Sequence, residues 1–79
     1  MNNSRRKQLL KIAEDLQNIL SDLQALQEEE QESFDNMPDS LKESERAQVS
    51  EQALSDIHDA ISSLEDAIPS VECACGELS

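Results

Sequence analysis

The sequence predicts an all-α protein, an antiparallel hairpin of two long amphipathic helices that self-associates into a four-helix bundle or a larger oligomer. Three observations support this fold class. Ala, Glu, Lys, Leu and Arg supply 34 of the 79 residues, with a single Gly and a single aromatic residue, which is close to the composition of long helices and coiled coils. Apolar residues recur at spacings of three and four in two segments, and Pro38 lies between them.

The first predicted helix covers residues 4–35, after a cap at Asn3 or Ser4. No Gly or Pro precedes Pro38, so nothing in the chain interrupts the helix earlier. Polar and acidic residues separate the members of one apolar stripe, which are Leu9, Ile12 or Ala13, Leu16, Ile19 or Leu20, Leu23 and Leu26. This stripe predicts one buried face on a long helix.

The second predicted helix covers residues 45–68, with Ser44 as its N-cap. Its stripe alternates spacings of three and four through Leu54, Ile57, Ile61, Leu64, Ile68 and Val71. Ala53, Ala60 and Ala67 lie beside it at intervals of seven, and small residues allow a partner helix to approach closely. Because proline removes a helical hydrogen bond, Pro69 predicts the end of the helix, followed by a flexible tail over 69–79.

Residues 36–44 form the predicted connector of a single-domain hairpin. Ser40 and Glu43 have the spacing of a capping box, which predicts one short helical turn. Phe34, Met37 and Leu41 are expected to close this end of the hairpin.

Each helix of an isolated hairpin hides only part of its apolar stripe, and so small a core barely offsets the entropy of folding. We therefore expect a homo-oligomer; a monomeric hairpin of low stability is the alternative. The predicted core and oligomer contacts are Leu9, Ile12, Leu16, Ile19, Leu23, Leu26, Leu54, Ile57, Ile61, Leu64 and Ile68.

The formal net charge of −12 disfavours direct binding to nucleic acid or to anionic membranes, because both are polyanions. It favours basic proteins as partners. No apolar segment has the length of a membrane span, and charged residues interrupt the segment that would form a signal peptide, so the expected location is the cytoplasm. The sequence contains no nucleophile elbow, no phosphate-binding Gly-rich loop and no complete metal-ligand set. It predicts a protein that is not an enzyme and has no cofactor.

Arg5 and Arg6 belong to a cluster of cations at the start of the first helix, where positive charge opposes the helix dipole. Two interpretations remain open. The end of the second helix can bring Glu65, Asp66 and Glu72 alongside, or the cluster can hold a phosphate or carboxylate ligand.

The connector end carries a second basic pair, Lys42 and Arg46, close to Phe34 and to the N-terminus of the second helix at Ser44. A helix N-terminus with an Arg and an aromatic ring can hold a nucleotide phosphate and stack a base. In the alternative interpretation Arg46 pairs with Glu43 or Asp39, and Phe34 only plugs the end of the hairpin.

An acidic strip near the end of the first helix comprises Glu28, Glu29, Glu30 and Glu32. Such a run is ordinarily a solvated face. It is also a candidate surface for imitating a nucleic-acid backbone and occupying the basic groove of another protein.

The connector sequence from Glu32 to Arg46, together with the Ala-Ile-x-x-Leu-Glu-Asp-Ala-Ile pattern of residues 60–68, resembles small acidic helical-hairpin proteins carried by phages and prophages. The similarity covers residues 5–68, and the tail Cys73-Ala74-Cys75-Gly76 departs from the pattern. The resemblance implies a phage accessory protein.

Such an origin favours a protein that counters host defence by sequestering a nucleotide signal in an oligomer. An acidic inhibitor of a basic host defence protein is one alternative, and a structural or assembly protein is another.

Overall fold

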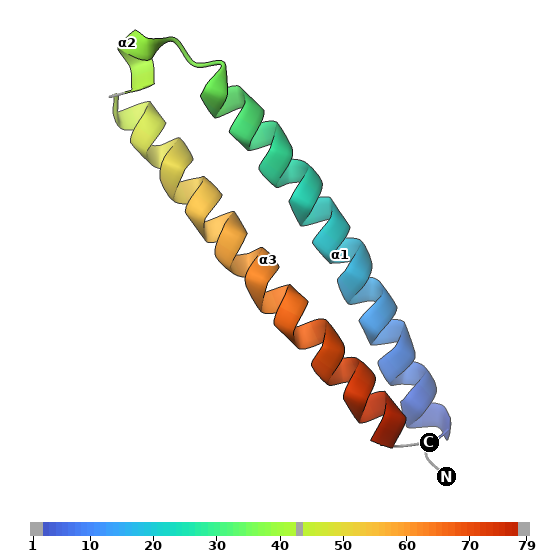
Figure 1. The fold of residues 1–79 in the computed structure, drawn as a ribbon. Helices are drawn as coiled ribbons and strands as arrows, with labels where there is room; N and C mark the ends of the chain where they lie inside the picture. The colour runs from blue at the N-terminus through green and yellow to red at the C-terminus, as the bar shows by residue number, and fades with distance from the viewer. Residues whose placement is uncertain (1–2, 43, 78–79) are drawn as a thin grey trace.

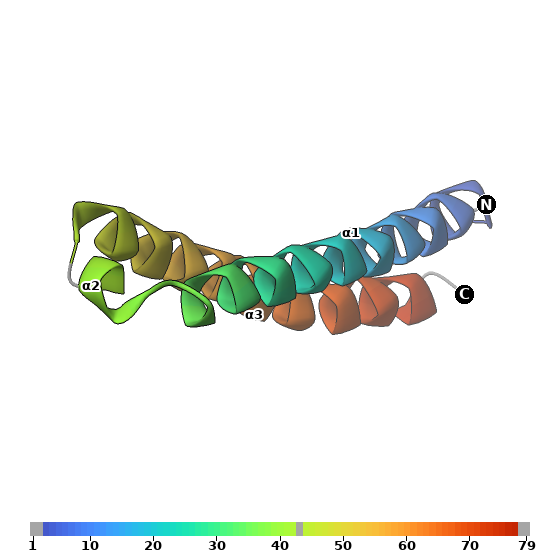
Figure 2. The same ribbon diagram turned by 90° about the horizontal axis from the view of Figure 1, so that it is seen from above.

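The computed structural model describes residues 3–42 and 44–77, except for the side chains of 41 and 42. Within these residues the chain forms two long helices, α1 (Asn3–Asp35) and α3 (Glu45–Glu77), joined through a short helix α2 (Asp39–Lys42). The long helices run antiparallel and side by side, so that the start of α1 and the end of α3 lie at one end of the hairpin and α2 lies at the other (Figure 1, Figure 2). The hairpin is 62 Å long and 14 by 12 Å across. The predicted helical hairpin is therefore confirmed.

The connection between the helices forms as its sequence predicts. The amide of Asn36 still bonds to the carbonyl of Glu32 at 3.0 Å, and the amide of Met37 turns back to Phe34 at 3.1 Å. α2 is the short helical turn expected in the connector. The hydroxyl of Ser44 accepts a hydrogen bond from the amide of Ala47 at 3.4 Å, which confirms Ser44 as the N-cap of α3.

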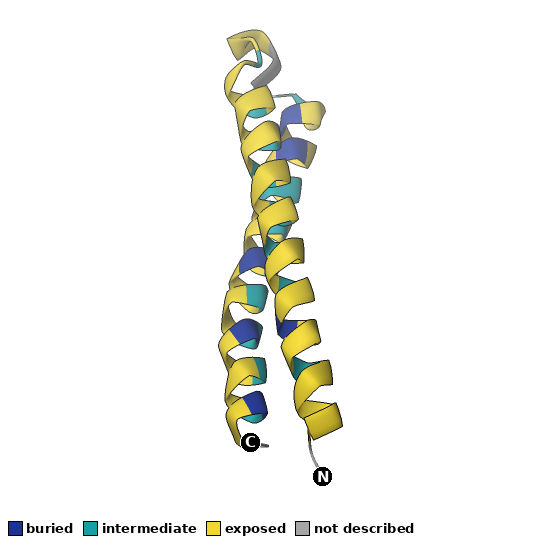
Figure 3. Cartoon of the chain, turned by 90° about the vertical axis from the view of Figure 1, so that its right-hand side faces the viewer, coloured by how far each residue is buried: buried dark blue, intermediate teal, exposed yellow. Residues whose placement is uncertain are grey.

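Every third or fourth residue of each long helix faces the other helix, and these positions form the seam of the hairpin (Figure 3). The seam residues of α1 are Leu9, Ala13, Leu16, Leu20, Leu23, Gln27, Glu30 and Phe34, all buried or half-buried. Those of α3 are Ala47, Ser50, Leu54, Ile57, Ile61, Leu64, Ile68, Val71 and Cys75, again buried or half-buried. The regular alternation of three and four is the heptad pattern of a coiled coil.

The seam differs from the predicted stripe of the first helix in one respect. Ala13 and Leu20 enter the seam, whereas Ile12 and Ile19 stay 47% exposed and Leu26 stays 53% exposed. These three residues, predicted as core or oligomer contacts, are thus not part of the hairpin core. Two neighbouring helical positions can satisfy the same spacing, and the partner helix selects only one of them.

The second helix does not end at Pro69. α3 continues eight residues further to Glu77, with Pro69 on its exposed surface, which corrects the predicted helix end at 68 and the predicted tail. The hydroxyl of Ser70 donates to the carbonyl of Asp66 at 3.2 Å beside the proline. Val71 and Cys75 extend the seam, and the Cys75 thiol donates to the carbonyl of Arg6 at 3.6 Å. This packing offsets the cost of a proline inside the helix.

Two contacts across the seam fix the register of the helices. Glu30 meets Ser50, and Arg6 meets Cys75. Residues of α1 and α3 whose numbers add to about 80 therefore lie at the same height along the hairpin.

Candidate functional site

Two adjoining pockets lie at the connector end of the hairpin and share Ser33, Met37 and Arg46 in their walls. The larger, of about 260 Å³, extends along α3 to Ser50 and Ala53. The smaller, of about 180 Å³, extends toward Pro38. Together they reach the lower part of the roughly 300–1,000 Å³ range of small-molecule sites. We call this region the connector pocket.

Arg46 supplies the positive charge of the connector pocket. It lies in the first turn of α3, where a cation opposes the helix dipole. Its side chain is exposed and makes no ion pair or hydrogen bond with any residue that the structure describes. The expected pairing of Arg46 with Asp39 is therefore not formed, and the pairing with Glu43 lies outside the described residues. Among the described residues, nothing neutralises the charge of Arg46.

The remaining walls combine apolar surface with hydrogen-bonding groups. Met37 is half-buried and Ser33 is exposed. At the inner side of the larger pocket, the carboxylate of Glu30 accepts a hydrogen bond from the hydroxyl of Ser50. A second lone pair on that carboxylate can accept from a hydroxyl group of a ligand. The pocket thus has a cationic outer side and a hydroxyl-accepting inner side.

The predicted ligand residues are distributed over both ends of the hairpin. Phe34 is half-buried in the seam and does not line the connector pocket, and the hydroxyl of Ser44 caps α3. The side chain of Lys42 lies outside the described part of the chain. Arg5 and Arg6 are exposed at the far end of the 62 Å hairpin. A single chain therefore does not bring Arg5 or Arg6 to Arg46.

The cations of the N-terminal end are largely unpaired within the described residues. Arg5 and Arg6 form no ion pair with Glu65, Asp66 or Glu72 there. Lys11 does pair with Asp15, at 2.7 Å between Nζ and Oδ1. This hydrogen bond, together with the charge of Asp15, raises the pKa of Lys11 above its ordinary value.

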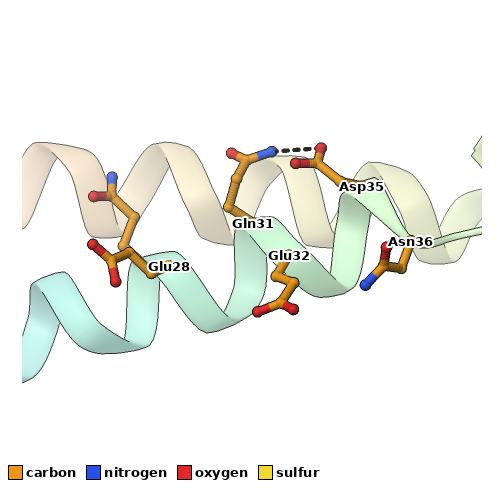
Figure 4. Close-up of a pocket in the computed structure, with 6 residues that line it drawn as sticks. Glu28, Gln31, Glu32, Asp35 and Asn36 are labelled. Atoms are coloured by element: carbon orange, nitrogen blue, oxygen red, sulfur yellow. Dashed lines mark hydrogen bonds between the residues drawn. The ribbon is translucent and has the colours of Figure 1, made fainter.

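The acidic strip is split by the fold. Glu28, Glu29 and Glu32 are exposed, whereas Glu30 turns into the seam toward Ser50. Glu28 and Glu32 also line a shallow depression of about 540 Å³ (Figure 4). Its other lining residues are Gln27, Gln31, Asp35 and Asn36. Gln31 donates to Asp35 at 3.0 Å across it. All six residues come from α1 and the residue that follows it, so the depression has no opposing wall.

Ser33, Met37 and Pro38 were not candidates in the sequence, although they line the connector pocket. Their place depends on the register: Ser33 and Arg46 are 13 positions apart along the chain but lie at one height. No sequence motif encodes this relationship, and only the closed hairpin brings the residues together.

The described residues contain no group of three or more His, Cys, Asp and Glu side chains that could hold a metal ion. His58 and Cys73 are exposed, and Cys75 is buried as a free thiol. No described helix combines the length and the apolar character that crossing a membrane requires.

Comparison with protein-family models, with curated protein sequences and with solved structures gives no match to this chain.

Proposed function

We propose that this protein is a non-enzymatic binding protein that self-associates and sequesters a small anionic ligand, of the nucleotide class, in the connector pocket. The observation that carries the proposal is the Arg46 side chain, which borders both parts of the pocket and has no partner among the described residues. An arginine in this situation is suited to a phosphate group, which it can bind through two parallel hydrogen bonds.

The chemistry of the pocket orients such a ligand. Its phosphate is attracted to Arg46 at the outer side, and the carboxylate of Glu30 repels it from the inner side. A sugar hydroxyl can instead donate to Glu30, and the apolar surface of Met37 and Ala53 can contact a base. This arrangement favours a nucleotide over inorganic phosphate, which would meet only Arg46.

The resemblance to phage and prophage hairpin proteins supports a role for this capture in countering a host defence that signals through nucleotides. In that role the protein lowers the free concentration of a signal and needs no catalytic group. The host bacterial cytoplasm would be its place of action.

Thermal melting with a panel of nucleotides tests the proposal, because a ligand that binds only the folded state raises the melting temperature. The panel contains cyclic dinucleotides, ADP-ribose and its cyclic forms, with inorganic phosphate for comparison. We expect at least one nucleotide to raise the melting temperature of the wild-type protein.

Arg46→Ala removes the cation of the pocket, and we expect it to abolish this rise. Lys7→Ala is the matched control, because it removes one positive charge at the other end of the hairpin and should leave the rise intact. The proposal fails if no nucleotide in the panel shifts the melting temperature, or if both variants lose the shift equally.

The acidic depression on α1 favours a second candidate, an inhibitor that binds a basic host protein. Glu28, Glu32 and Asp35 line one continuous surface with Gln27, Gln31 and Asn36 between them. In this function Glu28→Lys with Glu29→Lys should weaken binding to a basic host nuclease and reduce the salt dependence of the association rate. Arg46→Ala should leave that binding unchanged, which separates the two candidates.

A further inference from the structure

One flank of the hairpin carries large apolar side chains that the described residues cover only in part. Ile12, Ile19 and Leu26 lie on α1 at intervals of seven, each directly before a seam residue, and each is about half exposed. The equivalent positions of α3, each directly before a seam residue, are Ala53, Ala60, Ala67 and Ala74. We call these seven residues the apolar flank.

The connector pocket, which both long helices line, shows that the isoleucines and leucine of α1 and the alanines of α3 lie on the same side of the hairpin. Ser33 continues the row of Ile12, Ile19 and Leu26, and it lines the connector pocket together with Arg46 and Ala53 from the row on α3. The opposite flank is also formed by residues of both helices, since Gln17 of α1 and Glu65 of α3 border one depression.

The opposite flank is polar, which makes the apolar flank a specific feature. The corresponding positions of the opposite flank, which also recur every seven residues, are Leu10, Gln17, Gln24 and Gln31 on α1 and Glu51, His58, Glu65 and Glu72 on α3. Only Leu10 among them is a large apolar residue. In a hairpin that stays monomeric both flanks face water, so nothing would favour apolar residues on one flank and polar residues on the other.

We propose that a second copy of this chain covers the apolar flank, with its ends reversed, so that Arg5 of each copy lies over the connector pocket of the other. The flank has an uncharged centre, and Arg5 and Arg46 lie beyond its two ends, which resembles the apolar centre and polar rim of protein interfaces.

The sequence of the flank fits a twofold arrangement centred on Ile19 and Ala60, which lie at nearly one height. With the ends reversed about this centre, α1 of one copy lies over α1 of the other, so the large side chains pack against one another. The alanines in turn allow the two α3 helices to approach closely.

Charge favours the reversed orientation of the two copies. The N-terminal end carries the four cations Arg5, Arg6, Lys7 and Lys11 beside the acids of the end of α3, whereas the connector end carries Glu28, Glu29, Glu32, Asp35 and Asp39. With ends reversed, these four cations of each copy lie against the acidic connector end of the other. With ends aligned, like charges meet at the connector ends, which is unfavourable.

The reversed orientation also brings two arginines to one site. Arg5 precedes Ile19 by 14 residues, and Arg46 precedes Ala60 by 14 residues, in helices that run in opposite directions. Each arginine is thus about 21 Å from the centre of the flank, toward opposite ends of the hairpin. Reversing the partner places its Arg5 at the height of Arg46. This second cation for the connector pocket rests on the proposed function, whereas the interface itself does not.

Native mass spectrometry and light scattering of the full chain test the interface. We expect the wild-type protein to be a dimer and Ile19→Glu to be a monomer. Leu10→Glu is the matched control, because it places the same charge on an equally exposed residue of the opposite flank, and it should remain a dimer. Circular dichroism at the same concentration checks that Ile19→Glu keeps its helices, since Ile19 lies outside the seam.

A monomeric wild-type protein, a trimer or larger species, or equal dissociation by both substitutions would overturn the interface. Retained dimerisation of a helical Ile19→Glu would overturn it as well. A monomeric wild type would leave a partner of different sequence as the occupant.

Crosslinking tests the orientation independently of any single substitution that weakens folding. In a background of Cys73→Ser and Cys75→Ala, the variants Arg5→Cys and Arg46→Cys are prepared separately and mixed with a short bis-maleimide. We expect crosslinks between the two variants and few within Arg46→Cys alone. Efficient crosslinking of Arg46→Cys to itself would show aligned ends and overturn the reversed arrangement.

Nucleotide binding separates the two proposals. Arg5→Ala should remain a dimer and bind the nucleotide that stabilises the wild type about tenfold more weakly, while Lys7→Ala binds normally. A dimer that binds no nucleotide rejects the proposed function and leaves the interface standing. Unchanged affinity of Arg5→Ala, with wild-type binding intact, rejects only the shared pocket.

Discussion

The hydroxyl of Ser50 donates a hydrogen bond to the carboxylate of Glu30 across the seam, between residues 20 positions apart in the chain. Ser50 is only 8% exposed, and this pair stands at the connector end of a seam whose other half is apolar. A polar pair within a coiled-coil seam fixes the register, because sliding the helices would leave both groups without a partner.

Ser50→Ala should therefore lower the free energy of unfolding by about 1.5 kcal/mol, since it leaves a partly buried carboxylate without its donor. Replacing both partners, as Ser50→Ala with Glu30→Leu, should restore the stability or increase it. Urea unfolding of the wild type, the two single variants and the double variant gives the coupling free energy between Ser50 and Glu30. A coupling near zero would show that the contact contributes nothing to stability.

Pro69→Ala should stabilise the protein. Proline in a helix interior costs up to ~3 kcal/mol relative to alanine, since it removes a backbone hydrogen bond and crowds the preceding turn. The side chain of Pro69 is exposed, so its replacement loses little packing. We expect a higher melting temperature than for Ser62→Ala, an exposed control in the same helix. A lower melting temperature would mean that α3 bends at Pro69 in a way that its packing requires.

The two cysteines should differ in reactivity. Cys73 is exposed, whereas Cys75 is 6% exposed and its thiol contacts the carbonyl of Arg6. Iodoacetamide should modify Cys73 much faster than Cys75 in the folded protein, and the two rates should converge in denaturant. Mass spectrometry of the C-terminal peptide measures both rates. Equal rates without denaturant would contradict the docking of the end of α3 against α1.

The Lys11–Asp15 pair should give a pH dependence at alkaline pH. Its hydrogen bond to Asp15 raises the pKa of Lys11 above 10.5 in the folded chain. A raised pKa in the folded state means that the pair stabilises the helix fully below the unfolded value, and that this contribution is lost as the pH rises through the folded value. NMR titration of Lys11 should show a lower pKa in Asp15→Asn than in the wild type. The effect should shrink in high salt, because both groups are exposed.

The sequence alone determined the two long helices, the break between them and the cap of the second helix, whereas Asn3 and Ser4, the predicted cap residues of the first helix, lie inside α1. Apolar residues at spacings of three and four predicted both long helices, and Pro38 with its polar neighbours predicted the break between them. Ser44 was recognisable as a cap because a hydroxyl before an amphipathic run has a specific role there. These features are local, so the residues that encode them lie within a few positions of one another.

Tertiary structure decided which positions became the core. Ile12 and Ala13, or Ile19 and Leu20, satisfy the same spacing, and neighbouring positions on a helix differ by only about 100° in direction. The facing helix selected Ala13 and Leu20, and this choice left Ile12 and Ile19 to form the apolar flank.

The end of α3 and the connector pocket were also decided by the closed hairpin. Local rules end a helix near Pro69, but the seam contacts of Val71 and Cys75 with α1 continue it to Glu77. Likewise Ser33 and Met37 meet Arg46 only because the register sets them at one height. Such contacts join residues distant in the chain, and their free energy exists only once the two helices have packed together.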